Sequence, residues 1–172
     1  MRTPAAIQAV IDDLDYDFAS FSIDDFQRHI EARRGQLLQV RYVPFLYELF
    51  GFWCNAERSD YVFINAKLHP AQRIHTLLHE FAHILLEHRG MNMSELLGED
   101  LARELGFASY DGHLRAAERI GKENSPEDQE AELFVLLIQR KLLAARRLHE
   151  LYGEPTSIAS LRPYVEGLDF NG

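Results

Sequence analysis

One segment decides the interpretation of this chain: Leu78-His79-Glu80-Phe81-Ala82-His83-Ile84-Leu85-Leu86-Glu87-His88. It lies within residues 70–88, where apolar side chains recur with the spacing of one helix face. His79 and His83 are four residues apart, so on a helix both imidazoles project from one face and can reach one metal ion. Glu80 can then take a proton from a water on that ion, whose pKa zinc lowers to about 7. The segment therefore predicts a zinc site with Glu80 as the catalytic base.

The two histidines also allow a simpler interpretation. The chain carries eight histidines, and a pair with this spacing can arise by chance among surface or satisfied core residues. This pair nevertheless lies in a strongly apolar helix, where imidazoles and a carboxylate without partners are costly to bury. A bound metal removes that cost. We therefore expect one zinc ion per chain, with His79 and His83 as ligands.

A catalytic zinc site usually takes a third protein ligand, and the acidic start of a second predicted helix offers several. Glu127, Asp128 and Glu130 each place a carboxylate there, and Asp128 is the leading candidate. Asp128 and Glu132 are four residues apart, so one can bind metal while the other supports a ligand imidazole. Alternatively, acids in a first turn complement the helix dipole, and Asp128 stands where a capping box would place it.

The remaining histidines are less informative. His75 lies one helical turn before His79, where we expect a rim or supporting residue, with a second chelating position as the alternative. Three others are expected to face solvent: His69, His88 and His113. Three residues are candidate hydrogen-bond donors to the oxyanion that forms during hydrolysis: His75, Tyr110 and His113.

Outside these segments the pattern predicts an α+β protein in which helix predominates. Short helices are expected over residues 4–14 and from Ser22 to Gly35, where a capping box begins the second helix and glycine ends it. Three strands follow over residues 37–43, 51–55 and 61–65, and the last two form a hairpin in a small, mostly antiparallel sheet. Looser helices are expected over residues 94–121, a long helix over 125–147, and a short final helix between Pro155 and Pro163.

Composition narrows the class of protein. The 27 acidic and 18 basic residues give a net charge of −9, which argues against direct nucleic-acid binding. A single cysteine excludes a disulfide framework. The start of the chain lacks the apolar core of a signal peptide, and the longest apolar run, residues 133–138, is too short to span a membrane. We expect a cytoplasmic protein with one metallopeptidase-like domain over residues 1–172, divided into N-terminal helices (1–35), a core (36–150) and a short C-terminal helix and tail (151–172).

The chain resembles the ImmA/IrrE family of metallo-endopeptidases. The resemblance is carried by the strand Val62-Phe63-Ile64-Asn65, by the His-Glu-x-x-His segment from His79 to Leu86, and by residues 130–134. It implies a minimal zincin fold, in which a small sheet packs on the helix that carries the motif. It also implies that His79 and His83 bind zinc and that Glu80 is catalytic. The family's third ligand, usually glutamate, falls on Asp128, whose shorter side chain must bring its helix closer.

The resemblance further implies a substrate. Members of the family typically cleave a helix-turn-helix transcriptional repressor during stress responses or mobile-element induction, so transcriptional regulation is the expected role. The substrate would lie extended along the strand near residues 61–65. Two alternatives remain from the residues themselves. One is a metal-stabilised module that sequesters a regulator without cutting it, and the other is a helical scaffold with a fortuitous motif.

Overall fold

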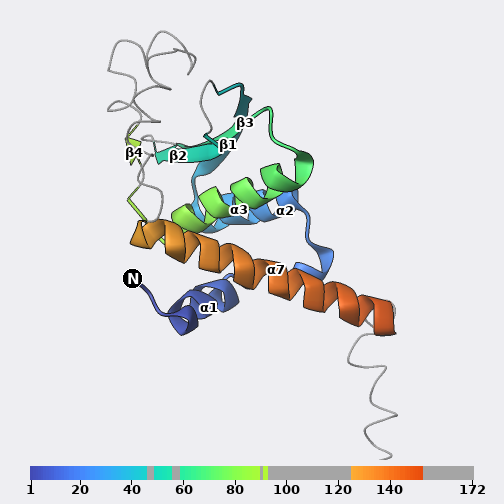
Figure 1. The fold of residues 1–172 in the computed structure, drawn as a ribbon. Coiled ribbons are helices and arrows are strands. Elements are labelled where there is room, and N and C mark those ends of the chain that lie inside the picture. Colours follow the sequence, from blue (N-terminus) through green and yellow to red (C-terminus); the bar gives the residue numbers. More distant parts are fainter. Residues whose placement is uncertain (46–48, 56–58, 90, 93–124, 153–172) are drawn as a thin grey trace, which may run out of the picture.

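The structure, a computed structural model, describes residues 1–45, 49–55, 59–89, 91–92 and 125–152, and within these it has an α+β fold. This confirms the predicted fold class. The described residues form four α-helices and a small sheet, whose arrangement can be followed in Figure 1. The elements are α1 (Pro4–Asp13), a 3-10 turn (Phe18–Ser20), α2 (Ile23–Arg34), β1 (Leu37–Val43), β2 (Gly51–Asn55), β3 (Ser59–Asn65), α3 (Pro70–Leu85), β4 (Met91–Asn92) and α7 (Pro126–Tyr152).

Some predictions are not tested by these residues. The helices expected over residues 94–121 and between Pro155 and Pro163 lie outside the described part of the chain. The division into one domain with three parts also stays a prediction. Among the helices that the structure describes, none combines the length and the apolar content needed to cross a bilayer.

The sheet is mixed, and this differs from the mostly antiparallel sheet that we predicted. Its strand order is β1-β3-β2-β4. The predicted hairpin is present, because β2 pairs with β3 in antiparallel fashion and Trp53 lies opposite Val62. However, β1 pairs with β3 in parallel, as does β4 with β2. Strand β3 therefore lies between β1 and β2 in the sheet, although it follows both of them in the sequence.

The helix starts follow the local chemistry of the sequence. Ser22 accepts a hydrogen bond from the Asp25 N–H at the start of α2, and Gly35 ends that helix with a φ of +64°. This left-handed conformation is easily adopted by glycine, which has no Cβ to clash with the backbone. His69 is exposed, as predicted, and caps the start of α3, with Pro70 in the first turn.

The C-terminal end of α3 departs from the predicted end at residue 88. The helix stops at Leu85, and Glu87 adopts a φ of +53°. A left-handed residue reverses the direction of the chain at a helix end. The next residue, His88, therefore turns back over the last turn, where its N–H donates to the carbonyl of His83 at 3.0 Å. Periodicity alone did not predict this turn, because Leu86 and His88 continue the apolar and polar pattern of the helix.

Helix α3 is the centre of the molecule. It contacts β2 and β3 on one side and α7 on another, while α1 contacts α7 (Figure 1). The main hydrophobic core fills the space between these layers. Its largest fully buried side chains come from α1, α2, β3, α3, α7 and the residues that follow α1 and α3. They are Ile7, Ile11, Leu14, Phe26, Ile30, Ile64, Leu78, Phe81, Ile84, Leu86 and Phe134.

Strand β2 lies unusually close to α3. A Cβ atom placed on Gly51 would lie 2.6 Å from Cγ2 of Thr76 and 2.9 Å from the carbonyl oxygen of Phe63. Only glycine fits this approach without a shift of its neighbours. Trp53 faces the main core, and Phe52 stacks on Phe63 on the other face of the sheet at 4.9 Å. This close contact positions β2 beside the motif-bearing helix.

Candidate metal centre

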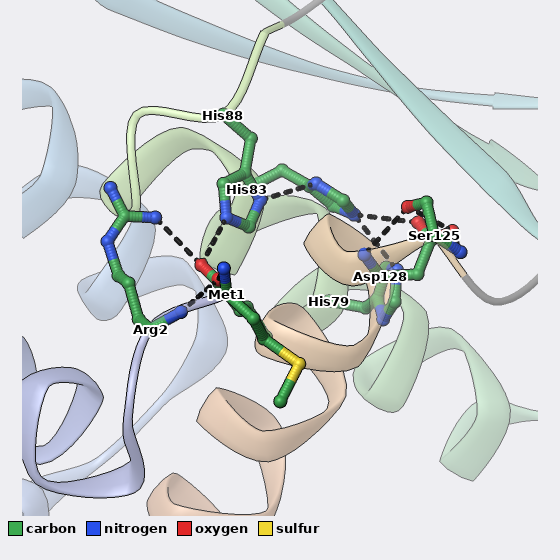
Figure 2. A network of polar contacts seen from close by, with 8 residues as sticks. Met1, Arg2, His79, His83, His88, Ser125 and Asp128 are labelled. Atoms are coloured by element: carbon green, nitrogen blue, oxygen red, sulfur yellow. Dashed lines mark hydrogen bonds and ion pairs between the residues drawn. The ribbon is translucent and has the colours of Figure 1, made fainter.

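Two helices bring three potential ligands together at one point. His79 and His83 project from one face of α3 toward Asp128 in the first turn of α7 (Figure 2). Nε2 of His83 lies 3.1 Å from Nε2 of His79 and 3.6 Å from Oδ1 of Asp128. One ligand atom from each residue lies within 4.8 Å of the others, an arrangement that can hold a metal ion. The structure thus assembles the three residues that the sequence singled out.

The imidazole of His79 is oriented by a carboxylate on α7. Its Nδ1 lies 2.8 Å from Oε1 of Glu132 and donates a hydrogen bond to it. A neutral imidazole carries one hydrogen, so this bond leaves Nε2 with a free lone pair that faces His83. Burial lowers the pKa of His79, and the Glu132 carboxylate opposes this shift. Burial, with His79 and His88 nearby, lowers the pKa of His83 to about 3. Both rings are therefore neutral near pH 7, as metal ligands must be.

The donor set fits a zinc ion. Tetrahedral zinc holds nitrogen and oxygen ligands at about 2.0–2.2 Å, which separates neighbouring ligand atoms by roughly 3.3–3.5 Å. The separations of 3.1 Å and 3.6 Å around His83 Nε2 lie close to that range. Two imidazoles and one carboxylate also leave a fourth position for water or substrate, which is typical of catalytic zinc sites. The facing Nε2 atoms of His79 and His83 are best satisfied by a cation between them.

Asp128 combines the two roles that the sequence left open. Its Oδ2 accepts hydrogen bonds from the Oγ of Ser125, at 2.8 Å, and from the N–H of Ser125, at 3.1 Å. Its own N–H donates to Ser125 Oγ at 3.0 Å, which completes a capping box at the start of α7. The other oxygen, Oδ1, faces His83. One carboxylate thus begins the helix with one oxygen and contributes to the candidate centre with the other.

Glu80 lies beside this group in a buried position. The residue is 7% exposed, and the backbone N–H of Trp53 on β2 donates to its carboxylate. Burial, reinforced by the negative charge of Asp128, raises the pKa of Glu80 to about 8 in the absence of a metal. A carboxylate with a raised pKa holds a proton more tightly than usual, which suits a group that accepts and returns a proton during catalysis.

The other acids considered as ligands lie in different surroundings. Glu127 is exposed and stands outside the group of three ligand atoms. Glu132 contacts His79, and His75 on the rim lies 3.4 Å from the same carboxylate. Glu130 is turned away toward Arg2, whose backbone N–H and guanidinium both donate to it. Burial disfavours the charge on Glu130, but the Arg2 and His88 hydrogen bonds outweigh it and lower its pKa to about 2.

His88 was predicted to face solvent, and this is wrong. The reversal at Glu87 buries it at 7% exposure, between His83 and Glu130. Its Nδ1 lies 2.9 Å from Nδ1 of His83, and its Nε2 lies 3.1 Å from Oε2 of Glu130. The spacing of five residues from His83 falls off the helical face, so it carried no signal for this contact. Nor did anything in the sequence indicate the role of Arg2. Tyr110 and His113, two of the oxyanion candidates, lie outside the described residues.

The comparison with protein families returned a match over most of the chain. The model of the peptidase M78 family, described as the IrrE N-terminal-like domain, matches residues 39–160. This range includes all three candidate ligands and Glu80. Neither the comparison with curated proteins nor that with solved structures returned a match.

Proposed function

This chain belongs to the peptidase M78 family of IrrE N-terminal-like domains, and on that premise we propose that it is a zinc-dependent endopeptidase. The observation that carries the proposal is the convergence of His79, His83 and Asp128 beside the buried carboxylate of Glu80. These four residues supply a metal-binding group with an open position and a proton acceptor next to it. That combination is what metal-assisted peptide hydrolysis requires.

Each side chain has a defined task in this proposal. A bound zinc ion would polarise the scissile carbonyl and increase the acidity of the attacking water. Glu80 would take a proton from the attacking water as the water oxygen bonds to the carbonyl carbon, and would return that proton to the amine nitrogen as the C–N bond breaks. The Trp53 N–H donates to the Glu80 carboxylate and holds it in place. Glu132 keeps the Nε2 lone pair of His79 directed at the centre.

The path of the substrate differs from our first expectation. Residues 61–65 belong to β3, which is paired on both sides by β1 and β2 and therefore has no free edge for a substrate strand. Strand β2 is the better candidate, because its backbone at Trp53 adjoins Glu80. Its outer edge is paired by β4 only at Cys54 and Asn55 among the described residues. We propose that an extended substrate segment lies along residues 51–53 of β2.

The proposed substrate is a separate DNA-binding repressor of the helix-turn-helix class, as the resemblance to the ImmA/IrrE family implies. The protein would then act in transcriptional regulation, including stress responses. Its net charge of −9 suits a basic protein partner, since opposite charges accelerate encounter. The alternative is a module that binds this repressor without cutting it.

A cleavage assay separates the two functions. The zinc-loaded protein is incubated with the helix-turn-helix repressor encoded nearest its gene, and the products are resolved by mass spectrometry. An endopeptidase gives defined fragments, while Glu80→Gln gives an intact complex and still binds zinc. A stable complex without fragments from the unmodified protein supports the binding module. Fragments that persist with Glu80→Gln would exclude Glu80 as the base.

A further inference from the structure

We propose that His88 is a positioning residue that orients the ring of His83 and fixes which of its nitrogens carries hydrogen. Glu130 and Arg2 hold His88 in turn. The inference rests on the metal site of the proposed function, which it deepens by adding a support for the second histidine. Figure 2 shows His88 and Arg2 on the side of His83 opposite Asp128.

The nitrogen that carries hydrogen in each histidine can be derived step by step, starting from Arg2 and Glu130 at the outer end of this series of hydrogen bonds. The guanidinium of Arg2 donates to Oε2 of Glu130 at 2.9 Å, and the Arg2 backbone N–H donates to Oε1. A carboxylate paired with a guanidinium is ionised and can only accept hydrogen bonds. His88 Nε2, which lies 3.1 Å from Oε2 of Glu130, must therefore be the donor.

The direction of the hydrogen bond between His88 and His83 follows from this first step. When His88 is neutral, one of its ring nitrogens donates and the other accepts, so Nδ1 is the acceptor once Nε2 is the donor. Nδ1 of His83 lies 2.9 Å from it and must therefore donate. The remaining nitrogen of His83, Nε2, keeps its lone pair, and this is the atom that faces His79 and Asp128. Glu130 thus determines, through His88, that His83 presents its ligand atom to the centre.

Burial makes this arrangement specific. The side chains of His88 and Glu130 are 3% and 7% exposed, so water provides little competition for their hydrogen bonds. A buried polar group without a partner is destabilising, which favours the one orientation that satisfies every member. The left-handed conformation of Glu87 is what directs His88 into this position.

The two ligand histidines are consequently supported in different ways. His79 donates directly to the carboxylate of Glu132, which is about half exposed. His83 reaches its carboxylate through a second imidazole, and this path is buried. Loss of an outer support of a ligand histidine typically weakens metal binding by about 10–100-fold. We expect an effect of this size when His88 can no longer accept from His83.

Zinc affinity is the first measurement, by competition with a chromophoric chelator. His88→Leu fills the buried space with an apolar side chain but removes the acceptor, and we expect zinc binding to weaken about 10–100-fold. His88→Asn retains an oxygen near the position of Nδ1, so it should recover part of the affinity. His29→Leu is the matched control, because His29 is partly buried on α2 and contacts Leu14 and Tyr16 rather than the centre. We expect its zinc affinity to match that of the unmodified protein.

A double-mutant cycle tests whether Glu130 acts through His88. Glu130→Gln should weaken zinc binding in the native background and should add nothing in the His88→Leu background. Additive losses of zinc affinity would show that the two residues act independently, and would overturn the proposal that Glu130 acts through His88. In the zinc-bound protein, nitrogen-15 NMR should show His83 protonated at Nδ1, with this signal altered in His88→Leu.

The outcomes distinguish this inference from the function on which it rests. If the unmodified protein binds no zinc, the proposed function fails. If it binds zinc and His88→Leu binds zinc equally well, only the positioning role fails. A His88→Leu variant that melts earlier without metal but keeps its zinc affinity would also overturn the role, because His88 would then serve packing alone.

Discussion

Ser125 and Asp128 bind each other reciprocally at the start of α7: the Asp128 N–H donates to Ser125 Oγ, and that hydroxyl donates to Asp128 Oδ2. The pair fixes the carboxylate so that Oδ1 points at His83. An aspartate is one methylene shorter than the glutamate that the resemblance places here. In the structure the first turn of α7 lies against α3, because Asp128 Oδ1 is 3.6 Å from His83 Nε2, and the capping box orients the aspartate side chain.

The first prediction concerns this pair. Asp128→Ala should abolish stoichiometric zinc binding, because the carboxylate ligand is removed. Ser125→Ala should retain zinc but reduce its affinity, and the lost cap should lower stability by about 1 kcal/mol. Glu127→Ala removes an exposed acid from the same turn and serves as the control. Isothermal titration with zinc and urea denaturation measure both effects. Full zinc binding by Asp128→Ala would transfer the third-ligand role to another residue.

Glu132 should tune the affinity of His79. Glu132→Gln removes the charge that His79 Nδ1–H contacts at 2.8 Å, so zinc affinity should fall by about 10–100-fold. His75→Ala provides the comparison, because His75 lies beside the same carboxylate but is not one of the three candidate ligands. We expect it to change zinc affinity little. Equal losses in the two variants would indicate a general effect of the rim rather than support of His79.

Glu80 should make the metal-free protein less stable as the pH rises. Its pKa is raised from the ordinary value of 4.5 to about 8 by burial and by Asp128. Between these values the folded state keeps the proton while the unfolded state loses it, so the free energy of unfolding falls with increasing pH. At about 1.4 kcal/mol per unit of pKa difference, the fall by pH 7.5 is on the order of 2–4 kcal/mol.

Glu80→Gln tests this directly, because the amide cannot ionise. Without metal, the variant should be more stable than the unmodified protein at about pH 7.5, and the two should converge near pH 4.5. His83, whose pKa is lowered to about 3, destabilises both proteins as the pH falls below its ordinary value, so its effect cancels in the comparison. Urea denaturation in the presence of a chelator gives the two pH profiles. Parallel profiles would contradict the burial of an ionisable Glu80.

Gly51 should tolerate no side chain. A Cβ at this position would meet Cγ2 of Thr76 at 2.6 Å, and overpacking of this kind costs about 1–3 kcal/mol. Gly51→Ala should therefore lower the melting temperature. Adding Thr76→Ser removes the clashing methyl group and keeps the hydroxyl that donates to the Gln72 carbonyl. The double variant should recover part of the loss, and the remainder reflects the Phe63 carbonyl at 2.9 Å. No recovery would place the strain elsewhere.

Much of the fold could be predicted because local signals were strong. Ser22 caps the start of α2, and Gly35 ends the helix in a left-handed conformation. Each boundary could be predicted from the type of a single residue. The grouping of the two histidines with Asp128 could also be predicted, because helical spacing and an acidic first turn are local features. The pairing of β1 with β3 was harder to predict. It depends on the path between β1 and β2, which alternation of side chains along a strand does not specify.

The support around the centre was predicted only where it is local. The four-residue spacing from Asp128 to Glu132 indicated that one acid could bind metal and the other hold an imidazole, and the structure places them in such positions. The His88 contact depends on a left-handed glutamate, a conformation that glutamate rarely adopts. The Arg2 contact joins residues 128 positions apart, and no periodicity spans that distance.

The link between Arg2 and Glu130 also determines when the centre can form during synthesis. A ribosome that has released only α1 to α3 has produced both histidines, but neither Asp128 nor the carboxylate that fixes His88. The nascent chain then holds two of the three ligands, with His83 unsupported. Full assembly requires the start of α7 to leave the exit tunnel and pack against α3, with residue 2 still free to dock on it. Because Asp128 and Glu130 follow α3 in the sequence, the candidate centre can assemble only after the start of α7 has been synthesised.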